Sequence, residues 1–305
     1  MTEYRAVFDA AVTFANGGGL QAQGFRLDLP GPDVTEAELG ELFVRHLGLL
    51  MVDRVSLTGV RVVAEPHKGS RGVAAAAAVP AGGARLVELS HVITAGMTTY
   101  PGLPGPEVTP HLTREASRER YAPGTEFAID RVTMVGNTGT YLDSPYHRYA
   151  DGTDLAGLPL GSFADLPAVV VRTAGGPRAV DVGALAALEV AGRAVLLHTG
   201  GDRHWGTRDY ARDNPYLTEA GARWLVEHGA RLVGIDSLNV DDASGGERPA
   251  HTLLLAAGIP VVEHLTGLEQ VPPTGARFTA APPRFARFGT FPVRAFAAVP
   301  LQPDG

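Results

Sequence analysis

The stretch 230–263 of the sequence, ARLVGIDSLNVDDASGGERPAHTLLLAAGIPVVE, decides the fold class. Its apolar runs at 232–235 and 259–262 are short and bounded by turn residues, which is typical of buried strands. A polar loop and a helix candidate at 252–257, ended by Gly258, lie between these runs. A strand, a helix and a second strand in this order predict a pair of parallel strands.

The same alternation of apolar runs and helical segments continues on both sides of this unit. Further strand candidates lie at 127–135, 169–171, 194–197 and 292–299, and helix candidates lie at 181–189 and 218–228. Asp181 and Thr218 are of the residue types that begin helices. The run at 127–135 alternates like a strand with one buried face. We therefore expect an α/β domain with a mixed sheet.

The first 68 residues follow a separate pattern. Strand candidates lie at 5–14, 20–29 and 55–63. The first two flank an Asn-Gly-Gly-Gly turn, which predicts a hairpin. Thr35 and Glu38 have the spacing of a capping box at the start of an amphipathic helix. Residues 1–68 are therefore predicted to form a small ββαβ unit.

A Gly- and Ala-rich stretch at 69–84, GSRGVAAAAAVPAGGA, follows this unit. It has no apolar periodicity and no turn chemistry that would specify one structure, so it is predicted to be a linker. The chain is then divided into the small unit at 1–68 and a larger α/β domain at 85–305.

The composition limits the classes of partner. The chain has 305 residues, of which 26 are Lys or Arg and 33 are Asp or Glu, so its formal net charge is −7. A negative balance argues against electrostatic binding to nucleic acid or to an anionic membrane. The lack of Cys excludes disulfides, thiolate ligands and a cysteine nucleophile. The charged N-terminus has no apolar signal segment, so we expect a cytoplasmic protein.

The densest group of polar residues lies at 137–147, NTGTYLDSPYH. Side chains alternate between the two faces of an extended segment, so Asn137, Tyr141 and Asp143 are predicted to share one face. The proline in this stretch fixes a turn and sets the distance of His147 from Asp143. These residue types are equally compatible with the wall of a site and with a solvated strand end.

A second group pairs His251, at the start of a helix candidate, with Glu263, at the end of the next strand. An ionised carboxylate after an apolar strand is costly to bury unless it is paired or binds a metal. We therefore expect the two residues to belong to one site. His264 follows Glu263 directly and is predicted to point away from it.

A third segment follows the strand candidate at 194–197, at the end of the strand where ligands bind in open α/β sheets. Its candidate pocket residues are Asp202, His204 and Trp205. Trp205 has the greatest need of a partner surface, because its ring is large and apolar. A solvated loop is the alternative interpretation.

Several of these motifs, in this order, resemble the cyclase / bacterial kynurenine formamidase (arylformamidase) family of metal-dependent amide hydrolases. The resemblance covers about residues 85–300 and is carried by Leu89-Ser90-His91, by 137–147 against the family pattern H-x-G-T-H-x-D-x-P-x-H, by 199–205, by 234–237, and by His251 with Glu263. It implies a swivelling β/β/α fold and hydrolysis of N-formylkynurenine, isatin or a related aryl formamide, lactam or cyclic imide. It also implies a homo-oligomer, either a dimer or a tetramer.

Asn137 and Tyr141 stand where the family pattern has two metal-binding histidines. The metal ligands that the resemblance still implies are Asp143, His251 and Glu263. They suit one divalent ion, zinc or alternatively manganese, with His147 as the catalytic acid and base and with Tyr141 and Asn137 stabilising the oxyanion. Two other interpretations stay open: a metal-free enzyme in which Asp143 orients His147, and a non-catalytic binding module of the same fold.

Overall fold

The computed structural model describes residues 2–15, 17–29, 31, 33–47, 49, 51–66 and 83–301. The chain divides into two compact units, Met1–Ala76 and Ala77–Gly305. Most of the predicted linker, residues 69–82, lies outside the described residues. At its predicted end, Ala84 is already the first residue of a strand.

The first unit is the predicted ββαβ arrangement. Its elements are β1 (Thr2–Phe14), β2 (Gly19–Leu29), α1 (Glu36–His46) and β3 (Val52–Pro66). The strands form one antiparallel sheet in the order β2-β1-β3. The capping box is confirmed, because Thr35 Oγ1 accepts from the Glu38 amide at 3.3 Å and the Glu38 carboxylate accepts from the Thr35 amide at 2.9 Å. Phe8 and Phe43 fill the core between sheet and helix.

Within the described part of the second unit, nine strands form one mixed sheet in the order β15-β7-β13-β12-β10-β8-β14-β16-β4. The central strands, all parallel to one another, are β8 (Leu166–Arg172), β10 (Ala194–His198), β12 (Leu232–Ile235) and β13 (Val261–Glu263). The antiparallel outer strands are β7 (Tyr141–Asp143), β15 (Thr290–Pro292), β14 (Arg277–Ala281), β16 (Arg294–Pro300) and β4 (Ala84–Glu88). The predicted parallel pair in the stretch 230–263 is therefore confirmed as β12 and β13.

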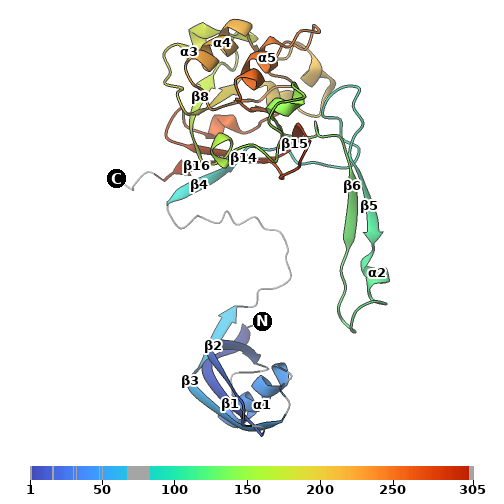
Figure 1. Ribbon diagram of the computed structural model, residues 1–305, viewed down its shortest axis with the longest axis vertical. Helices are drawn as coiled ribbons and strands as arrows, with labels where there is room; N and C mark the ends of the chain where they lie inside the picture. Colours follow the sequence, from blue (N-terminus) through green and yellow to red (C-terminus); the bar gives the residue numbers. More distant parts are fainter. Residues whose placement is uncertain are drawn as a thin grey trace. The chain divides into compact units, whose positions relative to one another are not determined.

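Three helices cover one face of this sheet: α3 (Val182–Leu185), α4 (Glu219–Glu227) and α5 (Pro249–Ala256), as Figure 1 shows. Val169 and Val171 of β8 pack in the cluster that includes these helices, whereas Val170 packs in the cluster on the other face. This explains why the central strands read as continuous apolar runs, since both faces are buried. Thr218 caps α4 as predicted, whereas α3 is a single turn and much shorter than expected. Among the described residues, no helix has the length and apolar character needed to cross a membrane.

The second unit also has two small pairs of strands. The parallel pair consists of β9 (Ala179–Val180) and β11 (Tyr216–Leu217). The antiparallel hairpin consists of β5 (Glu107–Leu112), the short helix α2 (Arg114–Ser117) and β6 (Ile129–Thr133). It extends away from the body of the unit in Figure 1.

Strand β6 corrects one prediction from the sequence. A strand was expected at 127–135 with one face buried, and the strand is present, but neither face is buried. Ile129 is 47 % and Val132 is 53 % exposed. An alternating apolar pattern reports the residue types of a strand but not whether another layer covers them.

Candidate active site

Strand β7 lies between β13 and β15 and thereby joins three distant parts of the chain. In the two antiparallel pairs, Tyr141 lies opposite Glu263, and Asp143 lies opposite Thr290. Residues directly opposite each other in a sheet project to the same face. The register of β7 therefore brings the motif at 137–147 next to the end of β13.

Thr290 links Asp143 to His147. Its hydroxyl donates to Oδ1 of Asp143 and lies 2.7 Å from Nδ1 of His147. A hydroxyl has only one proton and an ionised carboxylate only accepts, so the Thr290 oxygen accepts from the Nδ1–H of His147. In a neutral His147 ring, Nε2 then carries the lone pair. The His147 side chain is 36 % exposed, which leaves the ring accessible to a substrate.

Asp241 holds His251 in place. Asp241 follows β12, and its carboxylate accepts from the amides of Ala250 and His251 at 2.6 Å and 3.1 Å. The same carboxylate lies 2.7 Å from Nδ1 of His251, so Nδ1 carries a proton. Nε2 of His251 is then directed to Asp143 and Glu263, at 3.6 Å from an oxygen of each. A histidine with one nitrogen bonded to a carboxylate is the arrangement typical of a metal ligand.

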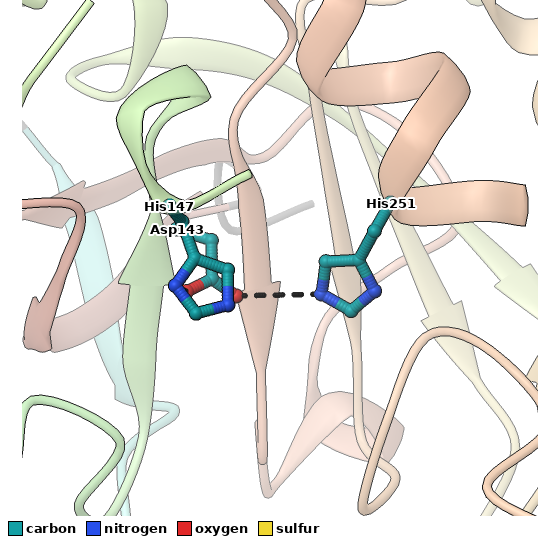
Figure 2. A group of neighbouring side chains, drawn as sticks. All are labelled: Asp143, His147 and His251. Atoms are coloured by element: carbon teal, nitrogen blue, oxygen red, sulfur yellow. Dashed lines mark ion pairs between the residues drawn. The ribbon is translucent and has the colours of Figure 1, made fainter. Parts of the chain in front are cut away.

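Asp143 has the one carboxylate oxygen of this group that is left without a partner. Its side chain is fully buried, and no described residue donates to Oδ2. Figure 2 shows the ring of His251 facing this carboxylate, and the ring of His147 overlaps the carboxylate in this view. The gap of 3.6 Å between Oδ2 and Nε2 of His251 is too long for a hydrogen bond. Two ligand atoms of one tetrahedral zinc ion lie roughly 3.4 Å apart, so the gap fits a shared cation.

The residues present therefore fit a divalent metal. Asp143, His147 and His251 each offer one ligand atom, and these atoms all lie within 4.8 Å of one another. Two of these three belong to the predicted ligand set. The predicted third ligand, Glu263, approaches His251 but is not a member of this three-residue group.

The other side of the site is closed by hydrogen bonds. The hydroxyl of Tyr141 donates to Oε2 of Glu263 at 2.6 Å, and the Val240 amide donates to Oε1 at 2.6 Å. Nε2 of His264 lies 3.3 Å from the Tyr141 hydroxyl, and Nδ1 of His264 lies 2.8 Å from the hydroxyl of Tyr210. Each of these side chains is buried and has a polar partner.

The charges of the site differ between its two sides. Burial raises the pKa of Asp143, but the charge of His147, the contacts with His251 and the Thr290 hydrogen bond outweigh it and leave the pKa below its usual value. Burial lowers the pKa of His251, but the charge of Glu263 and the carboxylates of Asp143 and Asp241 raise it to about 10. His251 can thus balance its acidic neighbours as an imidazolium or bind a cation as a neutral ring.

On the side of the site that contains Tyr141, burial raises the pKa values of Glu263 and of Tyr141 itself. The pKa of Glu263 rises to about 7, against the charge of His251 and the hydrogen bond from Tyr141. Burial and the charges of Glu263 and Asp143 raise the pKa of Tyr141 well above its usual value. Burial lowers the pKa of His264 to about 3. Tyr141 and His264 are therefore neutral hydrogen-bonding groups at physiological pH.

A cavity of about 900 Å³ opens onto this group. The predicted site residues that line it are Asn137, Tyr141, His147, His251 and Glu263. Tyr100, Leu103 and Arg248 also line it. Its volume is within the usual range for small-molecule sites.

The predicted pocket residues Asp202, His204 and Trp205 do not line this cavity. Asp202 accepts a hydrogen bond from the Thr266 hydroxyl at 2.8 Å, and His204 contacts its neighbour Arg203. The rings of Trp205 and His91 are stacked with their centres 3.9 Å apart. The structure therefore gives this segment packing partners behind the site, and its role in substrate binding stays a prediction.

Three residues that contact the candidate site were not assigned to it from the sequence, although the polar loop that contains Asp241 was expected to face either this cleft or water. Thr290 and Asp241 are an ordinary strand residue and one member of a polar loop, and only the sheet register and the start of α5 bring them into contact with Asp143 and His251. His264 was predicted to point away from the site, but it contacts Tyr141. Its φ of 58° departs from extended backbone, so the alternation of side chains breaks at this residue.

Comparisons with known proteins agree on one family. The model of the Cyclase family matches residues 87–242. The chain is 29 % identical over 214 residues to a kynurenine formamidase of Bordetella avium, and the match covers 69 % of this chain and 96 % of that protein. It is 30 % identical over 169 residues to a kynurenine formamidase of Geobacillus thermodenitrificans, covering 55 % of this chain and 78 % of that protein.

Solved structures show the same fold for the second unit. Isatin hydrolase A from Labrenzia aggregata, bound to benzyl benzoate, superposes with a TM-score of 0.60 at 24 % identity and covers 71 % of this chain and 94 % of its own. A structure described as a potential metal-dependent hydrolase with cyclase activity gives 0.59 at 24 % identity, with coverage of 70 % and 98 %. Because the family model matches more than half of the 305 residues, the chain belongs to the cyclase family.

Proposed function

We propose that this chain hydrolyses the C–N bond of amides, with an aryl formamide such as N-formylkynurenine, a lactam or a cyclic imide as substrate. The observation that carries the proposal is His147, held by Thr290 with its Nε2 unprotonated and its ring exposed to the cavity. The match to a kynurenine formamidase, which covers 96 % of that protein and 69 % of this chain, supports this reaction class. We also propose a cytoplasmic homo-oligomer with a small-molecule substrate, in line with the predictions from the sequence.

His147 moves the protons in this proposal. Nε2 accepts a proton from the water that attacks the amide carbonyl, and the imidazolium then delivers a proton to the departing nitrogen. Asp143 stabilises that imidazolium, because its ionised Oδ1 lies 3.7 Å from Nδ1 and Thr290 bridges the two. Thr290 also fixes the orientation of the ring during both transfers.

The oxyanion of the tetrahedral intermediate needs a hydrogen-bond donor from the cavity wall. The proton of Tyr141 is already donated to Glu263, so Tyr141 supplies this bond only by giving up that contact. Asn137 lines the cavity and has an amide group that can donate. We therefore assign the oxyanion contact to Asn137 first and to Tyr141 second.

Asp143 and His251 would hold a divalent metal with Glu263 as the third ligand, because His147 needs its free Nε2 to accept a proton. When bound, zinc or manganese supplies Lewis-acid polarisation and a lower pKa for water. The buried, unpartnered Oδ2 of Asp143 supports this cofactor. A metal-free enzyme is the second candidate, and the Tyr141 hydrogen bond that occupies Glu263 favours it.

Purified full-length protein, prepared without chelator, tests the proposal on formanilide, isatin and N-formylkynurenine. Release of formate or ring opening, measured with and without added zinc or manganese, is the expected result. Hydrolysis that survives dialysis against a chelator and a metal content near zero would select the metal-free mechanism. A lack of turnover on all three substrates under every metal condition would contradict the proposal and favour a binding module.

A further inference from the structure

Arg248 lies in the cavity wall, directly before α5, and one of its nitrogens is fixed by the main chain. Nη1 donates to the carbonyls of Gly245 and Glu247 at 2.8 Å and 2.7 Å, and to that of Asp242 at 3.4 Å. Three carbonyls on one nitrogen fix the orientation of the whole planar guanidinium. This arginine is therefore held in position before any ligand arrives.

The remaining donors of Arg248 are free. No described residue accepts a hydrogen bond from its Nε or Nη2, and none of the described carboxylates lies within ion-pair distance of it. Nε and Nη2 form the side of a guanidinium that binds a carboxylate through two parallel hydrogen bonds. Because Arg248 lines the cavity, we expect this side to be available to a ligand there.

A second cation lies in the same cavity. Arg148 follows His147 directly, lines the cavity, and has its guanidinium 5.5 Å from the ring centre of Tyr149. The Tyr149 hydroxyl donates to the carbonyl of Thr252, one turn into α5, at 2.9 Å. This bond joins the segment that holds Arg148 to the helix that follows Arg248.

The carboxylates of the cavity do not neutralise these arginines. Glu219 pairs with Arg223 at 2.7 Å, and Glu263 accepts from Tyr141 and from a main-chain amide. Glu247 offers Arg248 its main-chain carbonyl, with no ion pair between the two side chains. Among the described residues, no carboxylate that lines the cavity therefore forms an ion pair with Arg148 or Arg248.

We propose that Arg248, assisted by Arg148, forms a subsite for a carboxylate group of the ligand. This proposal rests on the proposed function, because it assumes that the ligand is a substrate whose amide reaches His147. It narrows the substrate class to amides that also bear a carboxylate. Arg248 acts as the specificity-determining residue, and Arg148 adds charge without a fixed geometry.

Calorimetric titration with benzoate and with benzamide tests the subsite without any turnover. We expect the wild type to bind benzoate at least tenfold more tightly than benzamide, and Arg248→Gln to weaken benzoate about ten- to hundredfold while benzamide changes less than twofold. Arg248→Lys keeps one charge but loses the fork, so an intermediate loss is expected. Arg212→Gln, which removes an exposed arginine outside the cavity, is the matched control. It should leave the affinities for both benzoate and benzamide unchanged.

Equal affinity of the wild type for the two probes overturns the proposal, whatever the variants do. Benzoate binding that is unchanged in Arg248→Gln also overturns it, because the carboxylate would then bind elsewhere, for example at Asp143 and His251. If Arg248→Gln fails to fold, two other measurements test the subsite: benzoate binding by Arg248→Lys, and the salt dependence of benzoate binding by the wild type. Benzoate affinity that falls with added salt while benzamide affinity does not is the supporting result.

Kinetics then separate this proposal from the proposed function. With formanilide and its ring-carboxylated derivatives, we expect Arg248→Gln to raise KM for the acids about ten- to hundredfold, with kcat and the neutral substrate within twofold. Carboxylate-selective binding without hydrolysis of any amide would support the subsite and contradict the proposed function. Hydrolysis with the same KM for neutral and acidic substrates, in the wild type and in Arg248→Gln, would support the proposed function and contradict the subsite.

Discussion

Asp143 and Tyr141 lie two residues apart on β7, but the polar atoms around them differ in whether they have hydrogen-bond partners. On the side of Asp143, the buried oxygen Oδ2 has no partner and lies 3.6 Å from Nε2 of His251, while His147 approaches the other oxygen, Oδ1. On the side of Tyr141, two residues earlier in β7, buried polar side chains are joined by hydrogen bonds. Buried polar groups are normally paired, so the side that leaves an atom open is the side where a cation or a substrate is expected. We call these the open side and the closed side.

Removing the open side should have the largest effect. We expect Asp143→Ala combined with His251→Ala to eliminate hydrolysis and to reduce the bound metal from about one ion per chain to none, because both shared ligands are lost. Elemental analysis by plasma mass spectrometry on chelator-free protein is the measurement. Equal metal content in the wild type and the double variant would contradict the assignment of the metal to the open side.

His147→Ala should lower kcat by about 10²–10⁴-fold, which is the usual contribution of a general acid and base. The ring is 36 % exposed, so we expect the free energy of unfolding to change little. Steady-state rates on an aryl formamide and denaturant unfolding measure the two effects. His111→Ala, at an exposed position on β5, is the control and should leave both unchanged. A wild-type rate for His147→Ala would remove this residue from the mechanism.

Tyr141→Phe tests whether the closed side is structural. The substitution removes the hydrogen bond to Oε2 of Glu263, and we expect it to lower the free energy of unfolding by about 1–3 kcal/mol because a buried acceptor is left without its donor. The loss in kcat should stay below about tenfold, since the oxyanion contact is assigned first to Asn137. Urea unfolding compared with Tyr121→Phe, an exposed tyrosine, measures the first effect. A loss in kcat of a hundredfold or more without loss of stability would make Tyr141 a catalytic residue.

The smallest effect concerns His91, which stacks on Trp205 behind the closed side. Burial lowers the pKa of His91 to about 4, and the charge of Asp202 opposes this only in part. The unfolded chain binds this proton near pH 6.5. Between pH 6.5 and 4 the unfolded state therefore holds more protons, and the free energy of unfolding falls as the pH falls.

His91→Phe keeps a ring for the stack and removes the titration. Between pH 8 and pH 5, we expect the wild type to lose about 1 kcal/mol more stability than the variant, a value kept small by the partial exposure of His91. Urea unfolding at both pH values is the measurement. The same loss in both proteins would mean that His91 does not titrate differently on folding.

Local sequence signals predicted the elements whose causes are local. The capping box of Thr35 and Glu38 was correct because both partners lie within one helical turn. The four central strands were found because burial on both faces leaves a continuous apolar run. The exposed faces of β6 were not predicted, because exposure depends on whether another layer covers the strand.

The candidate site divides in the same way. The motif at 137–147 and the pair of His251 and Glu263 could be picked out as chemically capable residues in the sequence, and the structure brings them to one cavity. Their partners could not be picked out, because Thr290 is 147 positions from Asp143 and reaches it only through the register of β15 on β7. His264 was misplaced because a positive φ cannot be read from a rule that assumes extended backbone.

The sequence by itself determined the α/β class, the ββαβ unit and the residues able to do chemistry, because apolar periodicity and residue type are properties of the chain alone. Only the tertiary structure decided which polar atoms in the site have no hydrogen-bond partner within the protein. The hydrogen bonds that close Glu263, bridge Asp143 to His147 and fix Arg248 join residues from separate loops and strands. A partner across a sheet or loop is set by register and packing, which no local pattern specifies.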